Sequence, residues 1–256
     1  MNRKILKYVL LDLLRSKFII SYTLFLLIMS MSVIYVGHDS SKAAVSILNI
    51  ILFVVPLVCI IFGTIHFYNS REFIEFLLTQ PVARKSIFWS EYFGISASLA
   101  AAFMIGVGLP VLTVGINMTG IYLLFTGIIL TFVFVSLAFL SSTINNDKVR
   151  GVGLSIILWL YLSVIFDGFV MMIFYMFRDY PLDKYIVALT SLNPVDLSRI
   201  LILLQIDISA LMGFTGATFQ KFFGSMTGKF TSLILLLLWI IIPAVVSLRI
   251  FNRKNF

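Results

Sequence analysis

The stretch IYLLFTGIILTFVFVSLAFLSST, residues 121–143, contains no charged side chain and is long enough to cross a membrane as a helix. The hydrocarbon core of a bilayer requires about 20 helical residues. Stretches long and apolar enough to cross a membrane recur along the chain, at residues 18–36, 46–67, 93–116, 121–143, 150–176 and 231–250. Hydrophobic residues make up 61% of the chain and charged residues only 12%. This composition predicts an all-α integral membrane protein, in which residues 1–256 form a single domain with six transmembrane helices.

Lysine and arginine residues are unevenly divided between the two ends of these spans. Basic residues close to a span are retained on the cytoplasmic side. With the N-terminus inside, that side holds Arg3, Lys4, Lys7, Arg15, Lys17, Arg71, Arg84, Lys85, Lys148, Arg150, Arg249, Arg253 and Lys254, which is 13 of the 19 basic residues. We therefore expect a protein of the bacterial inner membrane with both termini in the cytoplasm and no cleaved signal peptide. The asymmetry and contact with acidic lipid account for the net charge of +8, so no nucleic-acid partner is predicted.

Residues 1–17 mix basic and leucine-rich positions. This pattern is typical of a helix that lies against the inner leaflet. A basic flank that only enforces the topology would show the same residues, and both interpretations remain open.

The longest segment outside the spans covers residues 177–230. Asn193 as N-cap, Pro194 at the first helical position and Asp196 in the first turn predict the start of a helix. We expect it to lie flat on the outer leaflet. Continuing it as a seventh span would bury Gln205 and Asp207, which is costly in hydrocarbon.

The loop between the second and third spans, residues 68–92, is amphipathic. On a helical wheel Arg71, Glu72 and Glu75 share one face, and phenylalanine, isoleucine and leucine occupy the rest. Pro81 should end this helix, and we expect a second short helix from Arg84 to lead into the third span. The pattern predicts a helix parallel to the cytoplasmic membrane surface, which could serve as a lipid anchor or as a docking element.

The sequence EFIEF (72–76) followed by LLTQPVARKSIFWSEYFG (77–94) resembles the first cytoplasmic loop of type-2 ABC exporter permeases. In that family the loop is a coupling helix seated in a groove of a separate ATP-hydrolysing subunit, and two permease copies form the pathway. The resemblance implies a homodimer with two ATPase subunits. Glu91 departs from the family pattern, in which a basic residue is usual. The coupling residues implied are Arg71, Glu72, Phe73, Glu75, Phe76, Leu77, Pro81 and Arg84.

Within that family, LNPVDLSRI (192–200) and GFTGATFQKFFG (213–224) are similar to the external segment of the NosY group. Those permeases support copper-site assembly in periplasmic nitrous oxide reductase, with NosF-like ATPases and a NosD-like periplasmic repeat protein. The resemblance implies transport of a copper or sulfur species and an external partner site at Asn193, Pro194, Asp196, Arg199, Phe219 and Phe223. An exporter of a lipid, drug, peptide or ion, and a non-transporting scaffold, remain the alternatives.

The chain shows no catalytic pattern of its own. The phosphate-binding loop G-x-x-x-x-G-K-[ST] is absent, and GSMTGKF (224–230) has the wrong spacing and a phenylalanine in place of Ser or Thr. ATP and magnesium are therefore expected in the partner ATPase, and this chain is predicted to be a transport subunit rather than an enzyme. No metal or other cofactor site is expected either, because His38 and His66 fall on opposite sides of the membrane and the single cysteine, Cys59, lies within a span.

Asp167, Met171 and Met172 near the outer end of the fifth span are weak candidates for a transport pathway. A carboxylate within a span is a functional candidate, since its charge is costly there. Thioether sulfur is a soft ligand suited to Cu(I). Ordinary packing explains the methionines equally simply, and a local contact to an asparagine or to backbone near Gly168 would explain the aspartate.

Overall fold

A computed structural model describes residues 3–36, 40–114, 118–177, 188–204 and 226–254. Throughout these ranges the regular structure is helical. The helical stretches long and apolar enough to cross a membrane are Lys17–Val36, Lys42–Asn69, Arg84–Thr113, Met118–Ile144, Lys148–Ile173 and Gly228–Arg253. They correspond one to one with the predicted spans, so the predicted all-α membrane fold is confirmed.

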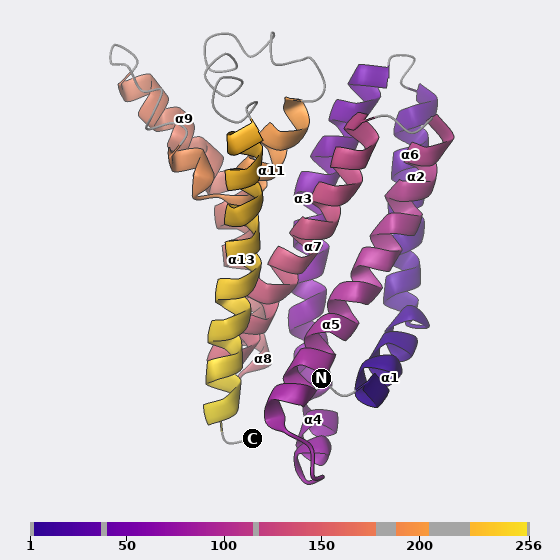
Figure 1. Cartoon of the computed structure of the whole chain (residues 1–256), viewed down its shortest axis with the longest axis vertical. Helices are drawn as coiled ribbons and strands as arrows, with labels where there is room; N and C mark the ends of the chain where they lie inside the picture. The colour runs from indigo at the N-terminus through magenta and orange to yellow at the C-terminus, as the bar shows by residue number, and fades with distance from the viewer. Residues whose placement is uncertain (1–2, 37–39, 115–117, 178–187, 205–225, 255–256) are drawn as a thin grey trace.

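Long helices run side by side along the bundle, and the chain ends close to the end where it begins (Figure 1). Two spans contain a π-helical turn between α-helical parts, a form that occurs mostly as single turns inside α-helices and frequently at functional sites. The helices of the spans are α2 (Lys17–Val36), α3 (Ser40–Asn69), α5 (Arg84–Phe103) with η1 (Met104–Gly108) and α6 (Leu109–Val114), α7 (Met118–Ile144), α8 (Lys148–Leu160) with η2 (Tyr161–Ile165) and α9 (Phe166–Met176), and α13 (Met226–Arg253).

Helix α7 is the centre of the bundle and packs against α3, α5, α8 and α13. Small residues allow this close approach, as is usual between helices in membranes. A Cβ atom on Gly63 of α3 would lie 2.9 Å from the Cβ atom of Ala138, and the Phe103 ring of α5 occupies the space beside Gly127. The side chains that make α7 apolar enough to cross a membrane therefore also determine how the neighbouring helices pack against it.

Three hydroxyl groups meet inside the contact of α3, α7 and α8. The Thr64 and Ser155 hydroxyls lie 2.6 Å apart, and the Ser155 and Ser141 hydroxyls 2.5 Å apart. Each hydroxyl also lies within hydrogen-bond distance of a backbone carbonyl one turn earlier in its own helix. These bonds satisfy polar groups that would otherwise be unpaired in an apolar interior.

The N-terminal helix α1 (Arg3–Leu14) is confirmed as a helix. Its buried stripe of Ile5, Val9 and Leu13 faces α5. The two helices approach closely because α5 has Gly94 opposite Val9, where a Cβ atom would meet the valine methyl at 2.6 Å. The separate short helix expected from Arg84 is wrong, because α5 continues unbroken from Arg84 through Gly94.

Helix α11 (Pro194–Leu203) begins where it was predicted, but its setting differs from the prediction. Eight of its ten residues are buried, and the helix packs against α7, α13 and α3. A helix lying flat on the outer leaflet would keep one face in lipid, so that prediction is wrong. The interior position places α11 among the spans, beside α13 in Figure 1.

Candidate functional site

The loop predicted to be amphipathic forms helix α4 (Arg71–Leu78), at the end of the bundle that holds both termini (Figure 1). Its inner face is fixed by packing. Ile74 is 1% exposed, and the Phe73 ring contacts the ring of Tyr8 in α1, with 5.5 Å between centroids. Leu77 is half-buried against the core. The helix ends before Pro81, as predicted, since proline disfavours helix in the preceding residue. Helix α4 is therefore held on the bundle by α1 and α5.

The outer face of α4 combines negative charge with an aromatic ring. Phe76 is 62% exposed, and Glu72 is exposed beside it. Glu75 accepts a hydrogen bond of 2.9 Å from Arg71 Nε across one turn, so part of the predicted acidic face is paired within the helix. Pro81 is also exposed. The surface available to another protein is centred on Glu72 and Phe76.

Arg84 has a contact within the chain that the sequence did not reveal. Its guanidinium donates to the carbonyls of Asn252 and Lys254, at 3.3 and 3.0 Å. The Lys254 ammonium in turn donates to the carbonyls of Thr143 and Asn145 at the end of α7. Burial lowers the pKa of Lys254, and the charge of Arg71 adds to this effect. Cations are favourable at helix C-termini, so these two side chains tie the C-terminal segment to α5 and α7.

Glu91, which departs from the family pattern, points into the bundle. It is 2% exposed, and its Oε2 atom lies 3.6 Å from His66 Nε2 on α3. His66 Nε2 is also 3.1 Å from the Ser70 hydroxyl, just before α4. Glu91, in α5, is thus buried against His66 of α3 and is not part of the exposed surface of α4. The pairing joins residues 25 positions apart, and no local sequence pattern indicates it.

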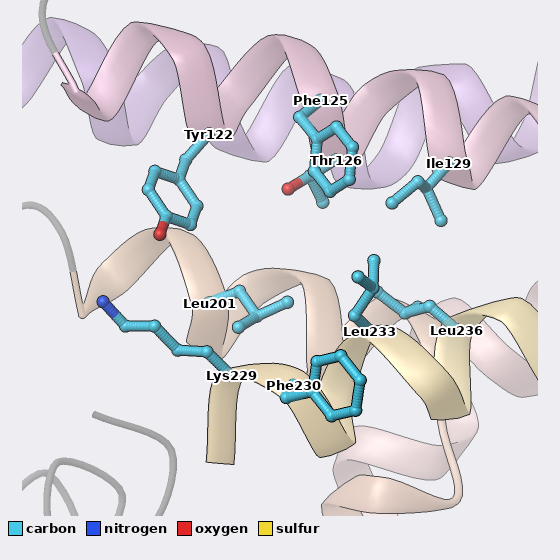
Figure 2. Close-up of a pocket in the computed structure, with 9 residues that line it drawn as sticks. All are labelled: Tyr122, Phe125, Thr126, Ile129, Leu201, Lys229, Phe230, Leu233 and Leu236. Atoms are coloured by element: carbon cyan, nitrogen blue, oxygen red, sulfur yellow. The ribbon is translucent and has the colours of Figure 1, made fainter. Parts of the chain in front are cut away.

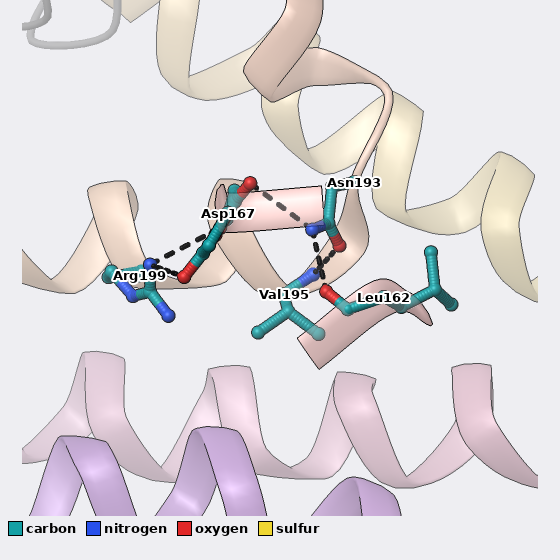
Figure 3. A network of polar contacts seen from close by, with 6 residues as sticks. Leu162, Asp167, Asn193, Val195 and Arg199 are labelled. Atoms are coloured by element: carbon teal, nitrogen blue, oxygen red, sulfur yellow. Dashed lines mark hydrogen bonds and ion pairs between the residues drawn. The ribbon is translucent and has the colours of Figure 1, made fainter. Parts of the chain in front are cut away.

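At the other end of the bundle, Asn193 organises a polar network around the start of α11 (Figure 3). Its side-chain oxygen accepts from the Val195 amide at 3.0 Å, which confirms the predicted N-cap. Its amide group donates to the Leu162 carbonyl at 2.8 Å and to Asp196 Oδ2 at 3.1 Å. Asn193 is fully buried. One side chain therefore joins α11 to the π-helical turn η2.

An ion pair completes this network. Arg199 Nη1 lies 2.7 Å from Asp167 Oδ2 and 3.4 Å from Asp196 Oδ1. Asp167 thus pairs with an arginine of α11 rather than with an asparagine or the backbone near Gly168. Two carboxylates share one guanidinium, so the group carries a net negative charge unless one of them holds a proton.

The carboxyl of Asp196 is the one that the surroundings favour in its neutral form. Burial raises its pKa to about 8, and a hydrogen bond with Asp167 and repulsion by that carboxylate act in the same direction. Arg199 and Asn193 oppose the shift. With Asp196 protonated at neutral pH, one arginine balances one aspartate. The network is then electrically neutral.

The remaining predicted residues are not brought together. Met171 and Met172 are 73% and 59% exposed on α9, whereas Asp167 is engaged by Arg199. Asn193, Pro194 and Asp196 are buried and serve contacts within the chain. Phe219 and Phe223 lie outside the described residues. Among the residues that the structure describes, no three His, Cys, Asp or Glu side chains cluster as a metal site would require.

Comparison with known proteins found one family. Residues 15–256 match the family described as ABC-2 family transporter protein. No curated protein sequence is significantly similar to the chain. The match includes every span, helix α4 and helix α11.

Proposed function

Because this chain belongs to the ABC-2 transporter family, whose members are membrane permease subunits, we propose that helix α4 couples it to a separate ATP-hydrolysing subunit. The observation that carries the proposal is the two-sided construction of α4. Ile74 and Phe73 fix the inner face on the bundle, while Glu72 and Phe76 are exposed at the end that holds both termini. An exposed aromatic ring is a typical anchor at a protein interface.

A helix fixed in this way can transmit motion as well as bind. Force applied at Phe76 would pass through Phe73 to Tyr8 of α1, and through the loop that joins α4 to α5. Glu91 and His66 lie directly behind the start of α4, at the junction with α3. Movement of the partner would therefore reach the third span and the N-terminal helix together.

Permeases of this family typically dimerise and work with ATPase partners. We propose a complex of two copies of this chain and two cytoplasmic ATPase subunits, which would bind ATP and magnesium. We place it in a bacterial inner membrane with both termini and α4 in the cytoplasm. In support, the apolar spans found in the described part of the chain are six, an even number, and both ends of the chain lie at the α4 end of the bundle (Figure 1).

The finer proposal is that the complex belongs to the NosY group and moves a copper or sulfur species for nitrous oxide reductase, with NosF-like and NosD-like partners. Its support is the sequence LNPVDLSRI, residues 192–200. Because Asn193 and Asp196 are buried in contacts within the chain, a periplasmic partner would meet neighbouring surface such as Leu192, which is 62% exposed. Export of another substrate remains the alternative.

Recovery of the ATPase with a tagged chain tests the coupling proposal. We expect an ATP-hydrolysing subunit to co-purify with the wild-type chain in mild detergent, and its recovery to fall roughly tenfold or more in Phe76→Ala combined with Glu72→Ala. Val149→Ala and Asp12→Ala remove an exposed apolar and an exposed acidic side chain elsewhere and should leave recovery unchanged. Equal recovery of the ATP-hydrolysing subunit from all variants would mean that α4 serves only as a lipid anchor.

The substrate proposal has its own readout. Deleting the gene should leave nitrous oxide reductase present but without its copper centre if the NosY assignment is right. Normal copper content in the deletion strain would reject that assignment and leave the permease assignment intact.

A further inference from the structure

A hollow of about 270 Å³ lies between α7, α11 and α13 (Figure 2). It is open on one side. The residues that line it are Tyr122, Phe125, Thr126 and Ile129 of α7, Leu201 of α11, and Lys229, Phe230, Leu233 and Leu236 of α13. Because three helices that are distant in sequence form its walls, the hollow is a product of the tertiary fold.

The lining is apolar along most of its length and polar at one end. Leu236 and Ile129 are buried in its wall, and Phe125 and Phe230 are about half exposed or more at its edge. The Lys229 ammonium lies over the Tyr122 ring, 5.7 Å from its centroid. Among the lining residues that the structure describes, Lys229 is the one charged side chain. The groove is therefore complementary to an amphiphile with one anionic end.

The polar end lies where a lipid head group would be. Lys229 is the second residue of the span Gly228–Arg253, and Tyr122 is in the second turn of the span Met118–Ile144. Both begin at the end of the bundle opposite the termini (Figure 1). Lysine and tyrosine are favoured at membrane interfaces, where an apolar stem and a polar tip face different surroundings. The leucine and phenylalanine side chains continue from there into the hydrocarbon region.

We propose that this groove binds part of one acyl chain of a bilayer lipid with an anionic phosphate head group, and that the head group lies against Lys229. Water gains no hydrogen bonds from walls of leucine, isoleucine and phenylalanine, while an unfilled groove forfeits van der Waals contacts. The volume is just below that of drug-sized ligand sites, so it suits part of one chain rather than a whole lipid. The site does not depend on the function proposed above.

Lipid retention by the purified full-length chain tests this site. The chain would be exchanged into detergent containing equal amounts of phosphatidylglycerol and phosphatidylcholine, and bound lipid would be counted by native mass spectrometry. We expect the wild type to retain phosphatidylglycerol in preference. Lys229→Gln should weaken that preference about fivefold, because one lysine near a membrane surface contributes about that much to binding an anionic lipid. Leu233→Trp should fill the groove and reduce retention of both lipids.

Two variants serve as matched controls. Lys42→Gln removes an exposed lysine from the start of α3, and Ile234→Trp adds the same bulk next to Leu233 on the exposed side of α13. Both should retain lipid as the wild type does. Equal retention of the two lipids by the wild type, or no difference between Lys229→Gln and Lys42→Gln, would overturn the proposal. Because Lys229→Gln changes a partly exposed side chain, the test does not depend on whether Leu233→Trp folds.

Discussion

The two ends of the bundle use charge in opposite ways. At α4, Glu72 is exposed and the Arg71–Glu75 pair is about 40% accessible. At α11, Asn193 and Asp196 are buried and bonded to each other, and Arg199 pairs with Asp167, with 33% and 29% of these two side chains accessible. Exposed ion pairs contribute little to stability, whereas a buried polar network is costly to break. The comparison indicates that the α4 end presents charge to another protein and the α11 end uses charge to hold its own helices.

The largest effect is expected from removing the centre of the α11 network. Asn193→Ala should lower the free energy of unfolding by about 3 kcal/mol, because the helix loses its N-cap and the buried Leu162 carbonyl and Asp196 lose a donor. Unfolding of the purified protein in detergent micelles measures this change in the free energy of unfolding. Asn193→Ser keeps an N-cap acceptor and should cost less, while Leu192→Ala on the exposed neighbour should change little. A loss below 1 kcal/mol for Asn193→Ala would mean that α11 is not held by this network.

Between pH 5 and 8, we expect a pH dependence of stability that arises at the same end of the bundle. The pKa of Asp196 is raised to about 8 in the folded chain, so the folded state binds the proton more tightly than the unfolded state. The contribution of Asp196 to the free energy of unfolding is complete below about pH 4 and is lost as the pH rises towards 8. We expect a loss on the order of 3 kcal/mol between pH 5 and 8, since the limiting slope is about 1.4 kcal/mol per unit and the slope falls as the pH approaches the pKa.

Asp196→Asn should remove this part of the pH profile, because asparagine does not titrate. Glu75→Gln at the other end makes the matched control and should leave the profile as in the wild type. If the wild type and Asp196→Asn showed parallel profiles, Asp196 would not hold a proton in the folded protein.

The smallest effect is expected where an exposed cation holds the C-terminal segment. Arg84→Ala should lower the free energy of unfolding by only about 0.5 kcal/mol, since its bonds to the carbonyls of Asn252 and Lys254 are exposed. The change should instead be local. Hydrogen exchange of residues 249–254 should become faster, while Lys85→Ala leaves it unchanged. Unaltered exchange in Arg84→Ala would show that Arg84 does not hold this segment.

The sequence predicted the features that depend on neighbouring residues. The six apolar runs correspond to six spans within the described residues, Pro81 marked the end of α4, and Asn193 marked the start of α11. The setting of α11 could not be predicted in the same way, because its burial depends on helices far away in the chain. Arg199 and Asp167 are 32 positions apart, and no periodicity indicates that they pair.

The same distinction applies to the candidate sites. The amphipathic pattern predicted α4, yet it could not show that Phe73 would face Tyr8 while Phe76 remained exposed. Arg84 was predicted to meet an ATPase, and its contacts with Asn252 and Lys254 appear only in the folded chain. No sequence pattern indicates the groove at Lys229, because its lining residues come from three helices that are distant in the chain.

Photo-cross-linking tests most directly whether α4 is the docking element for an ATPase. A benzophenone amino acid would be placed at position 76 on α4 or at position 192 near α11, both of which are exposed, and the complex would be irradiated in native membranes. The account predicts an adduct with the ATP-hydrolysing subunit from position 76 and none from position 192. An ATPase that co-purifies with the chain but gives no adduct from position 76 would contradict it.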